Sequence, residues 1–392
     1  MTTLWIYVYL FFVFFGPKIA GVVDTSILAN VCFLCFLKGY VTQLPTYVST
    51  LIVWILFILA CYFGVALYYE SIDIVFIGRL VRSLCSVLCI YVFCEYFKNV
   101  CIDKKIGWLV NILLIHAVVV ILTATVFVGF QEKLRVLNDF GAHVRKFRST
   151  GLMAGFDISG LICNIGVVLV LIRKRFNAVV FFIFSMAVLL TSRFSMISLS
   201  MILLLYFLLF RKENSFVKKI CVAIPLVVAG GLGFVILSLT TSGFLFDTIL
   251  PAVNVSSNVW DTLVWTYSKS DFEQTNSRYF VFPETFFSLL FGLGFYGGTD
   301  PGYIRVINCV GLFGLLLIIM WHVFFFYRIL IQKIQDDLTV KKRNFAAIVF
   351  ISVLLFLNMK NSYFFTGTFF ELMLFVFYNY MNESNAILLK KV

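Results

Sequence analysis

Long apolar runs follow one another along almost the whole chain, with short polar connections between them. A helix that crosses a bilayer needs about 20 mainly apolar residues, because the hydrocarbon layer offers its backbone no hydrogen-bonding partners. Hydrophobic residues make up 62% of the sequence and charged residues only 13%, which is more apolar than a soluble core requires. The runs are continuous and do not alternate in polarity, which favours helices over a barrel. The sequence therefore predicts an all-α polytopic membrane protein.

The lengths of these runs divide the chain into spans and loops. We expect about twelve transmembrane helices in a single domain that covers residues 1–392. The predicted spans are 4–16, 19–37, 48–68, 74–97, 106–129, 152–172, 177–191, 195–210, 220–240, 303–327, 345–358 and 362–381. Two longer loops stand out: a basic loop over residues 130–150 and a second loop over residues 241–302. Within the second loop, residues 286–298 are apolar but short and rich in glycine, so we expect a re-entrant or interfacial segment there.

The distribution of basic residues gives the predicted orientation. Alternating the spans places both termini on one side, together with the loops 38–46, 98–105, 173–175, 211–219 and 328–343. These segments hold 18 of the 31 Lys and Arg residues. Short basic loops stay in the cytoplasm, so we predict that this side is cytoplasmic. This bias accounts for most of the net charge of +12, which leaves no reason to expect a nucleic acid partner.

Basic residues also occur on the opposite side, where the positive-inside rule does not require them. The main ones are Arg79, Arg82, Lys133, Arg135, Arg145, Lys146, Arg148, Arg193, Arg278 and Arg305. Most of them are arginines, whereas the cytoplasmic loops favour lysine. A guanidinium binds phosphate oxygens through two parallel hydrogen bonds, which an ammonium cannot do. We therefore predict an arginine pocket outside the cytoplasm for a phosphate-bearing ligand.

Arg79 and Arg82 are three residues apart, so they share one face of the span 74–97. An unpaired cation inside a membrane is costly, and two interpretations are open. The side chains could extend to the outer lipid headgroups, or they could bind a diphosphate at the interface.

The segment Arg145 to Asn164 joins the basic loop to an apolar run. Arg148 stands next to the membrane entry and is followed by Gly151 and Gly155, which would let backbone N–H groups approach an anion. We predict that Arg148 is the principal phosphate-binding residue. Arg193 lies in a very short outer turn between two spans, so its side chain is expected to point back toward the bundle.

Three carboxylates are candidates for a general base, and the sequence does not rank them. Asp157 is expected first to cap the helix that begins near it, and only second to act as a base. Glu284 precedes the apolar run 286–298, where an acid is also common because of the helix dipole. Asp300 opens the span 303–327 from the outer side.

Aromatic and histidine side chains complete the polar inventory. Tyr279 and Tyr303 could stack on sugar rings, although an interfacial aromatic belt is the more frequent role of such residues. His116 and His322 lie in the middle of spans and are expected to be hydrogen-bonded within the bundle. The chain has no P-loop, dinucleotide fingerprint or H-E-x-x-H motif. We predict neither a cofactor nor a metal.

In their order, these motifs resemble the O-antigen polymerase and ligase superfamily of bacterial polysaccharide assembly, and specifically a Wzy-type polymerase. The resemblance runs from about residue 75 to residue 380. The matching motifs are Arg148-x-x-Gly151, Thr191-Ser192-Arg193, Arg278 late in a long outer loop, Gly292-x-Gly294 followed by Asp300-x-x-Tyr303, and Gly311-x-x-Gly314. Family members often have Pro-Asn where this chain has Phe156-Asp157, which puts the role of Asp157 in doubt.

The resemblance implies an enzyme that joins undecaprenyl-diphosphate-linked oligosaccharides at the periplasmic face of the inner membrane and releases undecaprenyl diphosphate. Membrane lipid and a polysaccharide chain-length regulator are the other partners it suggests. The candidate catalytic residues are Arg148, Arg278, Glu284, Asp300 and Asp157. The candidate diphosphate-binding residues are Arg79, Arg82, Arg145, Arg193 and Arg305, and the candidate sugar-binding residues are Tyr279 and Tyr303. Converging arginines would stabilise the diphosphate without a metal.

Two other functions and a purely structural role remain as alternatives. A ligase of the same superfamily would transfer the finished chain to lipid A core, but ligases typically carry a histidine where this chain reads Thr299-Asp300-Pro301. A flippase for lipid-linked oligosaccharides would place charges at mid-membrane depth and show an internal repeat, and the sequence shows no repeat. A structural subunit would not need the outer arginines.

Overall fold

The computed structural model describes residues 3–19, 23–37, 43–138, 148–153, 155–210, 219, 222–226, 282–295, 302–332, 334, 336–358, 364–365 and 367–389. The helices are α1 (Thr3–Phe15), α2 (Thr25–Phe36), α3 (Thr46–Tyr68), α4 (Ile74–Tyr96), α5 (Ile102–Thr125), α6 (Phe130–Asn138), α7 (Phe156–Ile172), α8 (Ala178–Leu189), α9 (Arg193–Phe210), α14 (Phe286–Phe291), α15 (Gly302–Leu330), α16 (Asp337–Leu357) and α17 (Gly367–Leu389). The strands β1 (Lys18–Ile19) and β2 (Val23–Asp24) form a small antiparallel hairpin.

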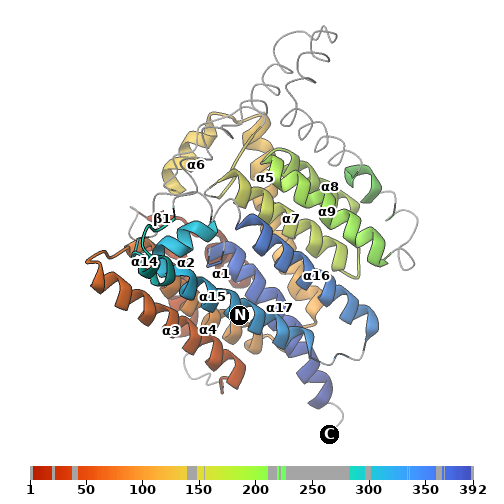
Figure 1. The fold of residues 1–392 in the computed structure, drawn as a ribbon. Helices are drawn as coiled ribbons and strands as arrows, with labels where there is room; N and C mark the ends of the chain where they lie inside the picture. Colours follow the sequence, from red (N-terminus) through yellow and green to blue (C-terminus); the bar gives the residue numbers. More distant parts are fainter. Residues whose placement is uncertain are drawn as a thin grey trace.

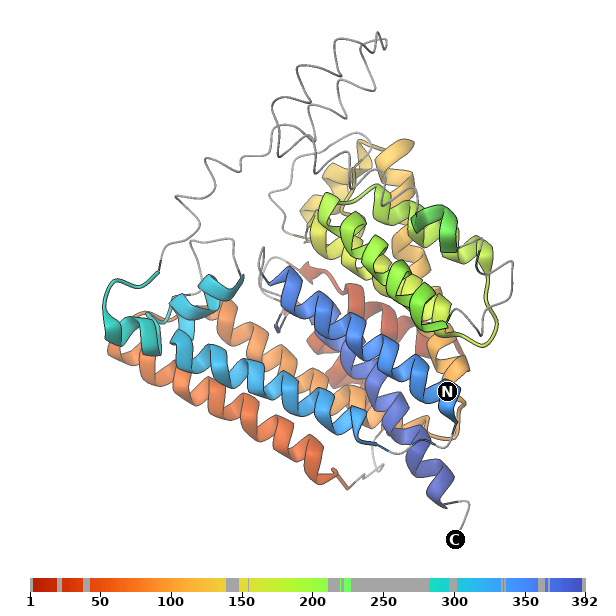
Figure 2. The same cartoon turned by 45° about the vertical axis from the view of Figure 1, so that its right-hand side comes forward.

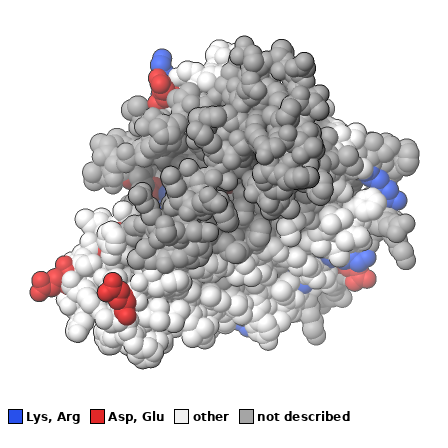
Figure 3. Space-filling model, turned by 45° about the horizontal axis from the view of Figure 1, so that its top comes forward, with Lys and Arg blue, Asp and Glu red and all other residues white. Residues whose placement is uncertain are grey.

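The all-α fold class is confirmed, together with helices that suit a membrane. Among the described residues, α3, α4, α5 and α15 are long and apolar enough to cross a bilayer, and α1, α2, α7, α8 and α9 are shorter apolar helices. The outer surface fits this environment, since Leu67, Ile74 and Val179 are each more than 60% exposed. In the space-filling view, most of the described side chains are uncharged and the charged ones lie near the margins (Figure 3).

The helices pack side by side in two groups (Figures 1 and 2). One group contains α3, α4, α14 and α15, and the other contains α5, α7, α8 and α9. Between them, α17 packs against α1, α4, α5, α15 and α16. All side chains of α17 from Thr368 to Asn382 are buried. A polar side chain on such a helix must therefore find its partner on a neighbouring helix.

The second predicted span begins later than expected. The helix was predicted to cover residues 19–37, but Ile19 lies in β1, Val23 and Asp24 lie in β2, and α2 begins at Thr25. The Asp24 carboxylate accepts a hydrogen bond from Ser26 N at 2.9 Å and so caps α2. An aspartate in this position starts a helix after itself, which is why the predicted helix was wrong for Ile19, Val23 and Asp24.

Helix α15 is interrupted at Gly311, where φ is +70°. Next to the interruption, Leu293 N donates to Asn308 O at 2.7 Å and Gly294 N donates to Cys309 O at 3.1 Å. These bonds replace helical ones, because lipid offers a backbone carbonyl no donor. A Cβ atom on Gly311 would lie 2.1 Å from a backbone oxygen of α14. Glycine is therefore required where the two segments meet.

The apolar run 286–298 forms the short helix α14 and then an extended turn. Thr285 begins α14 through a capping box with Ser288. The Tyr62 hydroxyl of α3 donates to Gly294 O at 3.2 Å. As far as it is described, the run is thus held between α3 and α15.

Two predicted loops are partly helical. The basic loop 130–150, which was predicted to connect two spans, begins with the short helix α6. The linker 328–343 is reduced to residues 331–336, because α15 continues to Leu330 and α16 begins at Asp337. Asp336 caps α16 by accepting from Thr339 N at 3.1 Å, and a further hydrogen bond from the Thr339 hydroxyl lowers the pKa of Asp336.

Candidate functional site

Arg148 is held beside the start of α7 by two contacts. Its Nε donates to Thr191 O at 2.7 Å, and its guanidinium carbon lies 4.2 Å from the centre of the Phe156 ring. Thr191 belongs to the turn between α8 and α9, and Phe156 is the first residue of α7. A charge-assisted hydrogen bond and a cation–π contact together fix the plane of the guanidinium.

The backbone around Arg148 is fastened to three helices. Ser149 N donates to Leu190 O, the C-cap of α8, at 2.9 Å. The Ser149 hydroxyl lies 2.6 Å from the hydroxyl of Thr123 in α5, and Gln131 Nε2 of α6 donates to Arg148 O at 3.1 Å. The loop 148–153 therefore has a defined place relative to α5, α6 and α8.

Gly151 allows this loop to approach α5 closely. Its φ is +55°, and a Cβ atom there would lie 2.6 Å from Val120 Cγ2 and 2.9 Å from His116 Cε1. Gly155 differs, because a Cβ atom at that position would meet no other atom within 4 Å. The requirement for glycine in this segment thus falls on Gly151 for reasons of space and backbone conformation.

Asp157 lies in the first turn of α7. The N-cap is Gly155 and the helix begins at Phe156, so the prediction that Asp157 caps this helix is wrong. The helix dipole favours a carboxylate in the first turn as well, which is why the sequence suggested a helix start here. Asp157 O accepts from the Ser195 hydroxyl at 3.4 Å. Asp157 therefore lies beside the turn between α8 and α9.

The turn between α8 and α9 is tightly packed on α7. Ser192 accepts a hydrogen bond from Ser195 N at 3.2 Å and so caps α9, of which Arg193 is the first residue. A Cβ atom on Gly160 of α7 would lie 2.1 Å from the Ser195 hydroxyl. The close approach brings the backbone of Arg193 to the same end of the bundle as Arg148 and Asp157.

Arg82 takes part in a buried ion-pair cluster. Its Nε lies 3.0 Å from Glu371 Oε1, and its Nη1 lies 3.0 Å from Asp24 Oδ2. Nη2 also donates to Val13 O at 3.3 Å, and the Ser86 hydroxyl donates to Glu371 Oε1 at 2.9 Å. The Arg82 side chain is 16% exposed and that of Glu371 is fully buried. Two carboxylates thus offset the charge of this arginine.

Sequence reasoning missed Glu371 as the partner of Arg82. The available signal was an acidic residue inside the apolar run 362–381, because acids within membrane spans usually pair with a cation. The pairing with Arg82 depends on the packing of α17 against α4, which the sequence does not reveal. The role of Arg82 as a diphosphate anchor remains a prediction.

The Arg82 cluster and the loop 148–153 meet at Thr368. The Thr368 hydroxyl lies 2.5 Å from Phe14 O and 3.9 Å from Met153 Sδ. Thr368 stands one turn before Glu371 on α17, and Met153 belongs to the loop. The two groups of charged residues are therefore neighbours at one end of the bundle.

Other candidate residues lie on the group formed by α3, α4, α14 and α15. Arg79 on α4 and Arg305 in the first turn of α15 are partly exposed. Tyr303 donates its hydroxyl to Leu355 O at 2.7 Å, which ties α15 to α16. Glu284 is exposed and precedes the residue that caps α14. None of these contacts tests the roles predicted for them.

Several predicted site residues lie outside the described residues. These are Arg145, Arg278, Tyr279 and Asp300, together with the side chain of Arg193. Their roles stay predictions. Within the described ranges, no group of three or more His, Cys, Asp or Glu residues could hold a metal ion.

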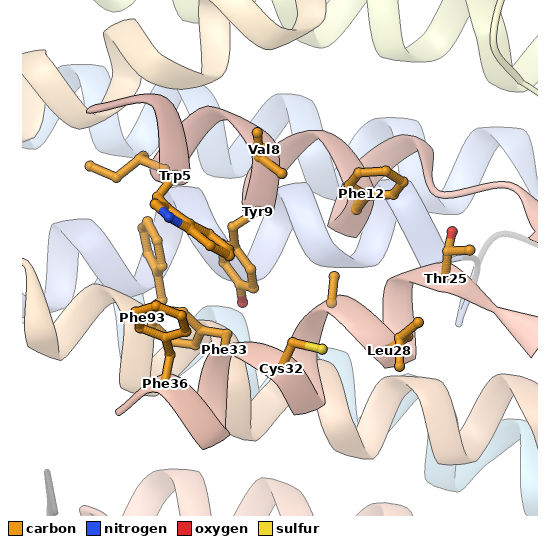
Figure 4. Close-up of a pocket in the computed structure, with 12 residues that line it drawn as sticks. Trp5, Val8, Tyr9, Phe12, Thr25, Leu28, Cys32, Phe33, Phe36 and Phe93 are labelled. Atoms are coloured by element: carbon orange, nitrogen blue, oxygen red, sulfur yellow. The ribbon is translucent and has the colours of Figure 1, made fainter. Parts of the chain in front are cut away.

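An apolar cavity of about 360 Å³ lies between α1 and α2. Figure 4 shows the rings of Trp5, Phe12 and Phe36 among the side chains that line it. At one end stands Thr25, whose neighbour Asp24 pairs with Arg82. The cavity thus runs along the two helices from the Arg82 cluster toward the opposite end of the bundle.

No family model matches the chain, and no curated protein matches it either. The resemblance to the O-antigen polymerase and ligase superfamily therefore rests on the short motifs alone. What the geometry itself defines is an all-α protein with membrane-spanning helices and an arginine held rigidly at one end of the bundle.

Proposed function

We propose that this protein is a polysaccharide polymerase of the bacterial inner membrane, which joins undecaprenyl-diphosphate-linked oligosaccharide repeat units at the periplasmic face. The observation that carries the proposal is the orientation of Arg148 by Thr191 O at 2.7 Å and by the Phe156 ring at 4.2 Å. A guanidinium held in advance stabilises charge that develops on a leaving diphosphate, because no reorganisation is needed during the reaction.

The proposed reaction is a glycosyl transfer between two lipid-linked sugars. A hydroxyl oxygen of the incoming repeat unit attacks the anomeric carbon at the reducing end of the growing chain. The bond between that carbon and the diphosphate oxygen breaks, and its electron pair leaves with undecaprenyl diphosphate. The proton of the attacking hydroxyl passes to a carboxylate. Arg148 binds the diphosphate oxygens, with Arg193, Arg145 and Arg278 as further predicted contacts.

Asp157 is our first choice for the base. It follows Phe156, whose ring faces Arg148, and its side chain is only partly buried. Glu284 begins a segment on the other group of helices, and Asp300 lies in the second long loop, so both remain alternatives. In this proposal Arg82 stabilises the packing of the helices and does not bind substrate, because Glu371 and Asp24 already bind its guanidinium.

The cavity between α1 and α2 is suited to the polyprenyl chain of a substrate. An isoprenoid is entirely apolar, and the cavity is lined by aromatic rings from Trp5, Phe33 and Phe93. Its end at Thr25 would place a diphosphate headgroup near the start of α2. In Figure 2, α1 begins and α17 ends toward the same side of the bundle, as the proposed cytoplasmic location of both termini requires.

A flippase for the same lipid-linked oligosaccharide is the second candidate. It is favoured by the fully buried Glu371, which pairs with Arg82 inside the bundle. Ionisable residues within membrane helices often mark transport pathways. The rigid support of Arg148 favours the polymerase, because a catalyst needs fixed geometry more than a transporter does.

The test uses purified protein and its undecaprenyl-diphosphate-linked repeat unit, with EDTA present and no nucleotide. Products are separated by size for the wild type and for the Arg148→Lys, Arg278→Lys and Arg175→Lys variants. Arg175 is exposed just after the far end of α7 and provides the matched control. We expect a ladder from the wild type and from Arg175→Lys, and a loss of about 100-fold in rate for Arg148→Lys.

Other results would reject the proposal. Transfer of a single unit only to added lipid A core would indicate a ligase. Movement of the unchanged substrate across liposomes without a ladder would indicate a flippase. If the Arg148→Lys variant forms the ladder at the wild-type rate, a bidentate contact from Arg148 is not needed for the reaction.

A further inference from the structure

His116 in α5 is fully buried and has a partner at each ring nitrogen. Its Nδ1 lies 3.2 Å from Leu152 N. A backbone N–H can only donate, so Nδ1 accepts and the proton of the neutral ring is on Nε2. Nε2 then donates to the Ser159 hydroxyl of α7 at 3.1 Å. The ring of Phe15 stacks on the imidazole at 5.2 Å, which holds its plane.

The imidazole is therefore in direct contact with the loop 148–153. A Cβ atom on Gly151 would come within 2.9 Å of the imidazole carbon Cε1, so the loop rests directly against the ring. Leu152 N is the donor that His116 satisfies, and Arg148 lies four residues earlier in the same loop. Loss of this acceptor removes one of the hydrogen bonds that fix the loop against α5.

We propose that His116 is a positioning residue that holds the loop 148–153 through Leu152 N and so places Arg148 against the diphosphate. The catalytic consequence rests on the proposed function. The clamp itself does not, because the hydrogen bond to Leu152 exists whatever the protein binds.

His322 provides a matched control. It is also a buried histidine inside a span, but its ring nitrogens face Ile318 O at 2.8 Å and Phe364 O at 3.1 Å. His322 lies on α15, and its other ring contacts in the described part of the chain include Phe365 and Phe370. A variant at His322 therefore reports the general effect of losing a buried imidazole.

Two amide substitutions separate the nitrogens of His116. The side-chain oxygen of His116→Asn reaches about the position of Nδ1 and can still accept from Leu152 N. The longer side chain of His116→Gln reaches about the position of Nε2 and leaves Leu152 N without its acceptor. We expect hydrogen exchange of the Leu152 amide to be about tenfold faster in His116→Gln than in the wild type, and near the wild-type rate in His116→Asn and His322→Gln.

Polymerisation kinetics test the catalytic consequence. We expect His116→Gln to lower kcat by about 10- to 100-fold with KM little changed, and His116→Asn to recover most of the rate. In the double variant His116→Gln/Arg148→Lys, the rate should be no lower than in Arg148→Lys alone, because both changes remove the same contact.

Each measurement can overturn a different part of the proposal. If the Leu152 amide exchanges as slowly in His116→Gln as in the wild type, His116 does not hold the loop 148–153. Protection lost equally in His116→Asn and His116→Gln would show that the Nδ1 acceptor is not the cause. Additive rate losses in the double variant would assign His116 a role that is independent of Arg148. If the wild type makes no polymer, the proposed function fails, while the exchange experiment still decides whether the clamp exists.

Discussion

Arg82 and Arg148 lie at the same end of the bundle but are held in different ways. Arg82 binds two carboxylates at 3.0 Å each, one of them fully buried. Arg148 binds a backbone carbonyl at 2.7 Å and stacks on an aromatic ring. The first set of partners offsets the charge, whereas the second set fixes the position of the guanidinium. Partners of the first kind compensate a charge inside the fold, and partners of the second kind orient the side chain.

The same difference appears in the glycines that accompany each arginine. A Cβ atom on Gly367 would lie 2.2 Å from Arg82 Cζ, so α17 passes directly over this guanidinium. Gly151, by contrast, lets the backbone of the loop 148–153 pack against the His116 ring. Close packing at Gly367 therefore confines the side chain of Arg82, whereas close packing at Gly151 confines the backbone of the loop that carries Arg148.

The largest effect is expected for Arg82→Gln. This change removes the cation that Glu371 and Asp24 both bind, and removal of one partner from a buried ion pair costs about 3–5 kcal/mol. Unfolding of the purified protein in detergent, followed by circular dichroism, measures the loss. Glu371→Gln is the informative companion, because it leaves one carboxylate per arginine and should change stability by less than about 1 kcal/mol. Equal losses in both variants would contradict a charge-compensating role for Arg82.

A smaller effect is expected for Gly151→Ala. Its positive φ and the contact with His116 strain any side chain, at a cost of about 1–3 kcal/mol that displaces the loop 148–153. Polymer formation should then fall while the helical content stays the same. Gly155→Ala is the control, because a Cβ atom there meets no other atom within 4 Å. If both variants behave alike, Gly151 has no special role in placing Arg148.

The smallest effect is expected for Phe156→Leu, which removes the ring under Arg148 but keeps an apolar side chain. A cation–π contact at a partly exposed position contributes about 0.5–1 kcal/mol. We expect the polymerisation rate to fall by about two- to fivefold, with an unchanged Tm in thermal unfolding. Phe15→Leu removes the ring that stacks on His116, so we expect it to affect the polymerisation rate only through His116 and by less than Phe156→Leu does. A larger loss of rate for Phe15→Leu than for Phe156→Leu would show that the ring on His116 matters more than the ring on Arg148.

The apolar runs were sufficient to predict the helices, because a bilayer requires continuous apolar segments whatever their neighbours are. They failed at Ile19, Val23 and Asp24, which lie in strands, because α2 begins only after its N-cap Asp24. Arg148 was singled out in the sequence because it stands before an apolar run, and its phosphate-binding role stays a prediction. Glu371 was not singled out, since its meaning depends on which helix lies opposite.

The sequence by itself determined that this chain forms membrane helices and carries arginines near their ends, because hydropathy and residue type are local properties. Only the tertiary structure decided which arginine meets a carboxylate and which meets a carbonyl and a ring. Arg82 and Glu371 are separated by 289 residues in the sequence, and only the packing of α17 on α4 brings them to 3.0 Å. A contact over such a sequence distance follows from helix packing, which short motifs do not encode.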